Sequence, residues 1–157
     1  MPTKKTNYID NQELEYHLSI LNMSYTDEVD RLVLDKGCTE KEARKKASGY
    51  ISEELGEMFL KIANNYINRN NFNKYTNVYR DEMIGLAIEY LCRFAKRFDK
   101  DKSNANAFFY CTKICHNAYL QAIKKEKKKS DLKDAIIKEA MFDTEADKWA
   151  KSKSEFI

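Results

Sequence analysis

The chain has 157 residues, of which 43% are apolar, and a formal net charge of +3, so it can bury one sizeable hydrophobic core. No apolar run approaches the roughly 20 residues that span a bilayer, and the four cysteines contain no CxxC pair, which indicates a reduced, cytosolic protein. One proline and four glycines leave long uninterrupted segments rich in helix formers. We therefore expect an all-α, compact helical domain.

The N-terminal segment, residues 1–50, contains two predicted helices. The first has Asn11 as its expected N-cap. Its apolar residues recur at helical spacing: Leu14, Leu18, Leu21, Tyr25 and Val29. The second begins with a capping box formed by Thr39 and Glu42 and carries charged residues as far as Lys46. Because it has no apolar stripe, we expect the second helix to be peripheral.

Residues 51–129 carry the strongest helical periodicity. A helix over residues 51–67 has a wide apolar face, and a short connection containing Tyr75 and Thr76 follows it. The next helix is predicted to bury one side: Met83, Ala87, Tyr90, Leu91, Phe94 and Phe98. Its outer side is predicted to hold Gly85, Leu86, Glu89, Cys92, Arg93 and Lys96. These two apolar faces need a third helix to cover them.

The third helix, over residues 106–129 with Asn106 as its N-cap, has two contrasting sides. The predicted core side contains Phe108, Cys111, Cys115, Ala118, Tyr119 and Ala122. The predicted outer side contains Tyr110, Lys113, Ile114, Asn117, Gln121 and Lys124. Amides hydrogen-bond to base edges, aromatic rings stack on unpaired bases and ammonium groups neutralise phosphates, so this side suits nucleic acid. A solvated surface helix with a basic tail is the alternative interpretation.

The third helix ends in a lysine run, and a weaker segment follows. The run consists of Lys124, Lys125, Lys127, Lys128 and Lys129. Binding of such a run to a polyanion weakens steeply with salt. We expect the chain to restart at Ser130, so that residues 130–157 form a separate short helix and a polar tail.

The sequence offers little catalytic chemistry. It has two histidines, and no phosphate-binding glycine loop or HExxH motif is present. Cys111 and Cys115 lie one turn apart and could bind zinc with His116. Their place on the predicted core side favours two small buried residues instead. We expect no catalytic residues, no metal and no cofactor.

Several short motifs occur in a distinctive order along the chain. They are Glu82-Met83-Ile84, Phe98-Asp99, Tyr110 with Thr112, Asn117-Ala118-Tyr119 and Ile123-Lys124-Lys125. In this order and spacing they resemble conserved region 2 of bacterial sigma factors. Residues 56–128 more closely resemble the late-transcription sigma factors of T4-type bacteriophages. The resemblance implies a three-helix sigma region 2-like core over residues 51–129, peripheral N- and C-terminal helices, and a location in the cytoplasm of an infected bacterium.

The resemblance also implies partners. The second core helix would bind host RNA polymerase core through Glu82, Met83, Gly85, Leu86, Glu89 and Cys92. The third would contact the non-template strand of an AT-rich minus-ten element through Phe108, Tyr110, Lys113, Ile114, Asn117, Gln121, Lys124, Lys125, Lys127 and Lys128. Tyr110 takes the place of a stacking aromatic, and Asn117 that of a base-contacting glutamine.

The C-terminal end resembles, over a few residues, the short motif by which these phage factors dock on the DNA sliding clamp with the help of a separate late co-activator. The residues concerned are Glu155, Phe156 and Ile157. Two other functions stay open from the sequence. One is a stand-alone protein that binds single-stranded nucleic acid, and the other is a helical polymerase-binding adaptor that contacts no DNA.

Overall fold

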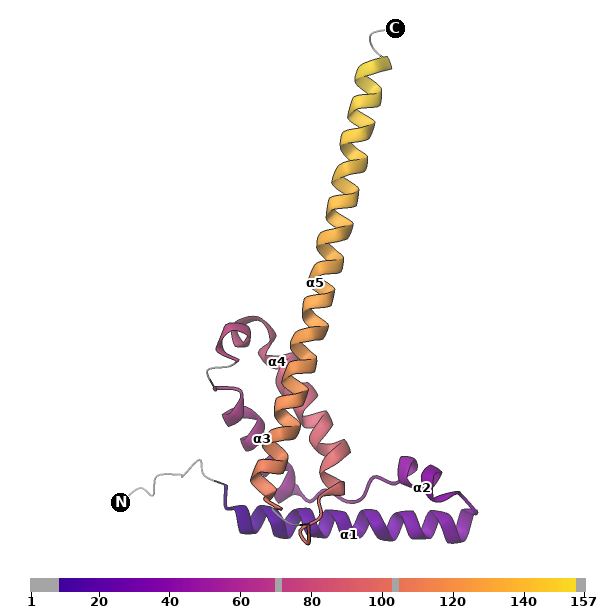
Figure 1. Cartoon of the computed structure of the whole chain (residues 1–157), viewed down its shortest axis with the longest axis vertical. Helices are drawn as coiled ribbons and strands as arrows, with labels where there is room; N and C mark the ends of the chain where they lie inside the picture. The colour runs from indigo at the N-terminus through magenta and orange to yellow at the C-terminus, as the bar shows by residue number, and fades with distance from the viewer. Residues whose placement is uncertain (1–8, 70–71, 103–104, 155–157) are drawn as a thin grey trace, which may run out of the picture. The chain divides into compact units, whose positions relative to one another are not determined.

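The computed structural model describes residues 9–69, 72–102 and 105–154, and these residues form helices and contain no strand (Figure 1). The helices are α1 (Asn11–Lys36), α2 (Glu40–Lys46), α3 (Glu53–Tyr66), α4 (Asn73–Phe94), the 3-10 helix η1 (Ala95–Arg97) and α5 (Ala107–Ser154). The predicted all-α fold is confirmed. The chain divides into two compact units, Met1–Ala122 and Ile123–Ile157, which we describe separately.

Helix α1 buries the predicted apolar series from Leu14 to Val29, but its cap differs from the prediction. Its N-cap is Asp10, whose Oδ1 accepts a hydrogen bond from the Gln12 N–H at 2.8 Å. Asn11 is instead the first helical residue, and its Oδ1 accepts from the Phe108 N–H at 2.9 Å. The predicted cap is therefore wrong by one residue, because the Asn11 side chain serves the start of a distant helix.

Helix α2 has the predicted capping box and packs on α1. The Glu42 N–H donates to Thr39 Oγ1 at 3.3 Å, and the Thr39 N–H donates to a Glu42 carboxylate oxygen at 3.2 Å. Ala43 and Ala47 are buried in a small cluster with Tyr25 and Val29 of α1. Two small residues thus anchor this helix without an apolar stripe.

Helices α3 and α4 pack together within the first unit, and Figure 1 shows α1 crossing one end of them. Ser52 caps α3, since its Oγ accepts from the Leu55 N–H at 3.2 Å. Helix α4 begins at Asn73, so the connection predicted around Tyr75 is in fact helical. The buried Phe72 ring, whose centroid lies 5.2 Å from that of Tyr119, anchors this earlier start.

Lys96 is buried, although the α-helical period placed it on the outer side. The chain tightens into η1 at Ala95, which changes the direction of the side chains that follow. Lys96 Nζ donates to the Ala47 carbonyl at 2.7 Å and lies 4.8 Å from the centre of the Tyr25 ring. Lys96 therefore connects η1 with α1 and with Ala47, the C-cap of α2.

In the first unit, α5 buries the predicted small residues, from Cys111 to Ala122, together with Tyr119. The Tyr119 hydroxyl donates to the Ala63 carbonyl of α3. In the second unit the predicted restart at Ser130 is wrong, because α5 continues without a break to Ser154. No glycine or proline interrupts this stretch, so nothing local stops the helix. Among the described residues, no helix has the length and apolar content needed to cross a membrane.

Candidate nucleic-acid interface

Four exposed side chains form a line along the first unit's part of α5. Phe109, Lys113, Asn117 and Gln121 follow one another at intervals of four residues, which places them on one side of a helix. Phe109 is 64% exposed. The opposite side of the helix is buried through Cys111, Cys115 and Ala118 and so holds this line outward. The four residues, named here the α5 line, combine an aromatic ring, an ammonium group and two amides.

Two asparagine side chains fix the start of α5. Asn106 Oδ1 accepts from the Phe109 N–H at 2.8 Å. Asn11 Oδ1 accepts from the neighbouring Phe108 N–H at 2.9 Å. The first turn of a helix has N–H groups without intrahelical acceptors, so two capping side chains stabilise it. Phe109 is therefore presented from an ordered helix start.

A groove of about 230 Å³ lies beside the α5 line. Its lining residues are Arg97, Phe98, Asp99, Lys102, Ala105, Asn106, Phe109, Tyr110 and Lys113. Three of these are cationic, one is acidic and three are aromatic. Aromatic rings next to cations suit a single-stranded nucleic acid, whose bases stack and whose phosphates are negative.

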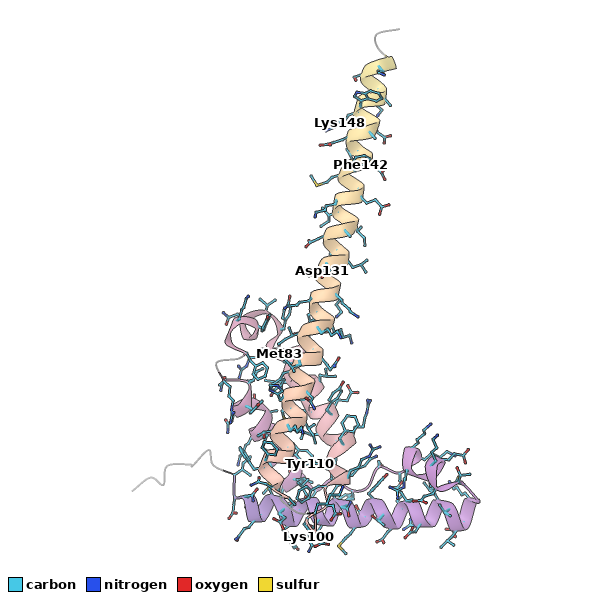
Figure 2. The ribbon with its side chains drawn as sticks, in the orientation of Figure 1. Met83, Lys100, Tyr110, Asp131, Phe142 and Lys148 are labelled. Carbon is cyan, nitrogen blue, oxygen red and sulfur yellow. The ribbon has the colours of Figure 1, made fainter. Side chains whose placement is uncertain are left out.

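Tyr110, labelled near the start of α5 in Figure 2, is half-buried. Its hydroxyl donates to the Phe94 carbonyl at 3.0 Å, and its ring centre lies 5.3 Å from that of Phe98. Burial raises the pKa of the Tyr110 phenol, so the group stays a neutral donor. Tyr110 therefore forms part of the groove wall, whereas Phe109 supplies the open aromatic face.

The structure changes two other expectations for α5. Ile114, predicted to face outward, is buried, since the apolar side of this helix is wider than the predicted stripe. Phe108, predicted to face the core, is 40% exposed and lines a second cavity of about 330 Å³ with Ile9, Tyr66 and Arg69. Phe109 lies four residues before Lys113 and shares its helix side, a spacing that the sequence already contains.

The lysine run lies in the second unit, in the part of α5 that begins at Ile123. Its members Lys124, Lys125, Lys127 and Lys128 are all exposed. Lys129 forms an ion pair with Glu126 at 2.9 Å. This unit presents a concentrated positive charge on a regular helix.

The predicted polymerase contacts on α4 are mostly accessible. Glu82, Gly85, Glu89 and Cys92 are exposed and Leu86 is half-buried. Met83 has no exposed surface and lies in the core, which is consistent with its place on the predicted buried side. It cannot touch a partner in this structure, so its predicted contact role does not fit. The three clamp residues, Glu155 to Ile157, lie outside the described residues.

Cys111 and Cys115 behave as core residues. Burial raises the pKa of both thiols, that of Cys115 to about 12, so both are neutral near pH 7. His116 Nδ1 lies 3.2 Å from the Tyr66 hydroxyl. Within the part of the chain that the structure describes, no three His, Cys, Asp or Glu residues are grouped to hold a metal ion.

Comparison of the chain with known proteins found no matching family model, curated protein or solved structure.

Proposed function

We propose that the protein is a phage sigma factor that binds host RNA polymerase core and directs it to AT-rich minus-ten elements of late promoters. The observation that carries the proposal is the α5 line beside the aromatic and basic groove. In this proposal Phe109 stacks on an unpaired base of the non-template strand, Lys113 pairs with a phosphate, and Asn117 and Gln121 hydrogen-bond to base edges. The sequence motifs that resemble sigma region 2 support the same role.

The exposed side of α4 supports the polymerase part of the proposal. Glu82, Gly85 and Glu89 are spaced so that they share one side of the helix. Glu89 pairs with Arg93 at 2.7 Å. Glu82 is exposed and offers an acidic group to a basic partner surface. A glycine at position 85 lets a partner approach the helix backbone closely.

The test is run-off transcription from an AT-rich late-type promoter with host core polymerase, with and without the protein. We expect promoter-specific transcripts only when both are present. Phe109→Ala should reduce them about 10-fold, the effect of losing one base stack. Tyr50→Ala is the matched control, because Tyr50 is also an exposed aromatic of the first unit, at 68%. Core polymerase that gains no promoter preference from the protein would refute the proposal.

Polymerase binding is tested separately with charge reversal. Glu82→Lys should weaken co-purification with core polymerase, whereas Glu57→Lys, an exposed site on α3, should not. We also propose, from the resemblance alone, that the C-terminal residues contact a sliding clamp aided by a late co-activator. Deleting Phe156 and Ile157 should then abolish clamp stimulation and spare basal initiation.

A second candidate function is binding of single-stranded nucleic acid without polymerase. The exposure of Phe109 next to Arg97, Lys102 and Lys113 favours it, since these groups need no partner to stack on bases or to meet phosphates. Fluorescence anisotropy of a labelled single strand with the protein alone distinguishes this candidate from the sigma factor. Tight binding without polymerase, together with no effect of Glu82→Lys, would select this candidate. A polymerase-binding adaptor would instead retain full activity after Phe109→Ala and Asn117→Ala.

A further inference from the structure

The second unit exposes several large apolar side chains on one helix. They are Leu132, Ile136, Ile137, Met141, Phe142 and Trp149, and each is between 56% and 74% exposed. Such a concentration on a single helix is unusual for a surface that contacts only water, because apolar surface gains free energy when it is covered. The proposed function uses none of these residues.

Some of these residues fit a seven-residue repeat. With Leu132 at the first position of the repeat, the first and fourth positions are Leu132, Ala135, Glu139, Phe142, Ala146 and Trp149. Apolar residues at these two positions form the seam between paired helices. Five of the six fit the pattern, and Glu139 is the exception. Paired helices of this length would cover the large side chains of the seam.

Glu139 decides the orientation of such a pair. In a parallel pair each seam residue meets its own copy, so two Glu139 carboxylates would face each other away from water. In an antiparallel pair the first position of one helix meets the fourth position of the other. Glu139 then lies beside Phe142 of the second copy, and Leu132 beside Trp149. The small Ala135 meets the small Ala146, so the large residues do not crowd one another.

The charges that flank the seam are compatible with the antiparallel pair. Lys138 and Glu145 occupy the same flanking position of successive repeats. In the antiparallel pair this position faces its counterpart, so Lys138 of each helix meets Glu145 of the other. The two-fold symmetry produces this ion pair twice. In a parallel pair Glu145 would face Ala150, and Lys138 would face Asp143 instead. Both orientations therefore give two ion pairs, so Glu139 favours the antiparallel pair, and the role of Glu145 tests it.

We propose that residues 132–149 of α5 bind the same segment of a second copy of this chain as an antiparallel two-helix coiled coil. The seam is Leu132, Phe142 and Trp149, and the paired charges are Lys138 and Glu145. This inference uses only residues of the second unit and does not depend on the proposed promoter function, so either can fail without the other.

The first test is self-association of the full chain by sedimentation equilibrium over a wide concentration range. We expect a species of twice the chain mass of 18.5 kDa to appear with increasing concentration. Trp149 is the only tryptophan in the sequence, so the emission should shift to the blue in step with dimer formation. The double variant Phe142→Ala with Leu132→Ala should weaken dimerisation about 100-fold or more and keep the emission red-shifted. Circular dichroism checks that the helix content is unchanged.

The second test uses charge swaps. Lys138→Glu and Glu145→Lys should each weaken the dimer about 10-fold, because each replaces two attractive pairs with two repulsive pairs. Mixing the two single variants should restore association as a heterodimer. Lys133→Glu and Asp134→Lys are matched controls at exposed positions away from the seam and should have no effect.

Three outcomes would overturn the proposal. One is a chain that stays monomeric, with red-shifted emission, at every concentration reached. Another is a dimer that is insensitive to the Phe142 and Leu132 substitutions. The third is a dimer that Lys138→Glu weakens but Glu145→Lys does not, because this result would fit a parallel pair.

Discussion

Lys96 is a buried cation whose contacts connect three parts of the first unit. Its ammonium group donates to the Ala47 carbonyl at 2.7 Å, and its own carbonyl accepts from the Asn22 amide at 2.8 Å. Lys96→Ala removes the ammonium and leaves the Ala47 carbonyl without this donor, so we expect the free energy of unfolding to fall by about 1–3 kcal/mol. Urea denaturation measures this change. Lys100→Ala, at an exposed site, is the control.

The same residue predicts a dependence of stability on pH. Burial, followed by the repulsion of Arg97, lowers the pKa of folded Lys96 below its ordinary value of 10.5. Between the lowered value and 10.5, the unfolded chain binds more protons than the folded chain, so a rise in pH stabilises the folded state. The wild-type protein should therefore gain stability relative to Lys96→Ala as the pH rises through this window. A constant difference in unfolding free energy would contradict the prediction.

Asn11 predicts a second stability effect at the residue scale. Its side chain caps α5 across 97 positions of sequence by accepting from the Phe108 N–H. Asn11→Ala should lower the free energy of unfolding by about 1 kcal/mol. Asn11→Asp keeps the acceptor and adds a negative charge at a helix N-terminus, so it should preserve stability. Gln12→Ala, at an exposed neighbouring site, serves as control. The midpoints of thermal unfolding are compared for the wild type and the three variants. Equal midpoints for the wild type and Asn11→Ala would show that the Asn11 side chain does not stabilise α5.

At the scale of single elements, local sequence patterns were sufficient for the helices with strong periodicity. The apolar face of α3 and the capping box of α2 depend on residues at most four positions apart, and both are confirmed. The buried series of α1 and of the first part of α5 followed from the same spacing. The all-α fold was therefore predictable.

Several of the expectations that failed depend on contacts distant in sequence. Asn11 caps a helix that begins at Ala107. The buried Lys96 side chain donates to the carbonyl of Ala47, 49 residues earlier in the chain. The partial burial of Tyr110 comes from Phe94 and Phe98, which belong to the preceding elements. No periodicity within one helix encodes such contacts. The α5 line was only partly predicted for the same reason, since Tyr110, expected to face outward, is half-buried, and Phe109 is the exposed aromatic ring.

The unbroken course of α5 is itself testable. Ser130 is a helical residue in the interior of this element, where proline removes a hydrogen bond and clashes with the preceding turn. Ser130→Pro should reduce helix content by circular dichroism and increase amide exchange on both sides of position 130. Ser130→Ala is the control, because alanine at the same position favours the helix. Unchanged helicity would support the break that the sequence suggested.

At the scale of the whole molecule, the chemistry is divided between two units. The first, Met1–Ala122, contains the core, the α5 line and the accessible side of α4. The second begins at Ile123 and contains the lysine run and the exposed apolar residues. Aromatic and amide groups give selectivity for bases, whereas clustered lysines give affinity that does not depend on sequence. The two contributions should respond differently to salt.

In the proposed function, the lysine run sets how binding of single-stranded DNA depends on salt. Each lysine that neutralises a phosphate of a single strand adds about 0.7 to the slope of log affinity against log salt concentration. Replacing Lys124 and Lys125 with alanine should reduce this slope by up to about 1.4 and weaken all sequences alike. Phe109→Ala should lower affinity with little change of slope, because it removes a stack and no charge. The double variant Lys133→Ala with Lys148→Ala is the control, because it removes the same charge outside the lysine run. If the control reduces the salt slope equally, the net charge of the protein, rather than the lysine run, attracts the DNA.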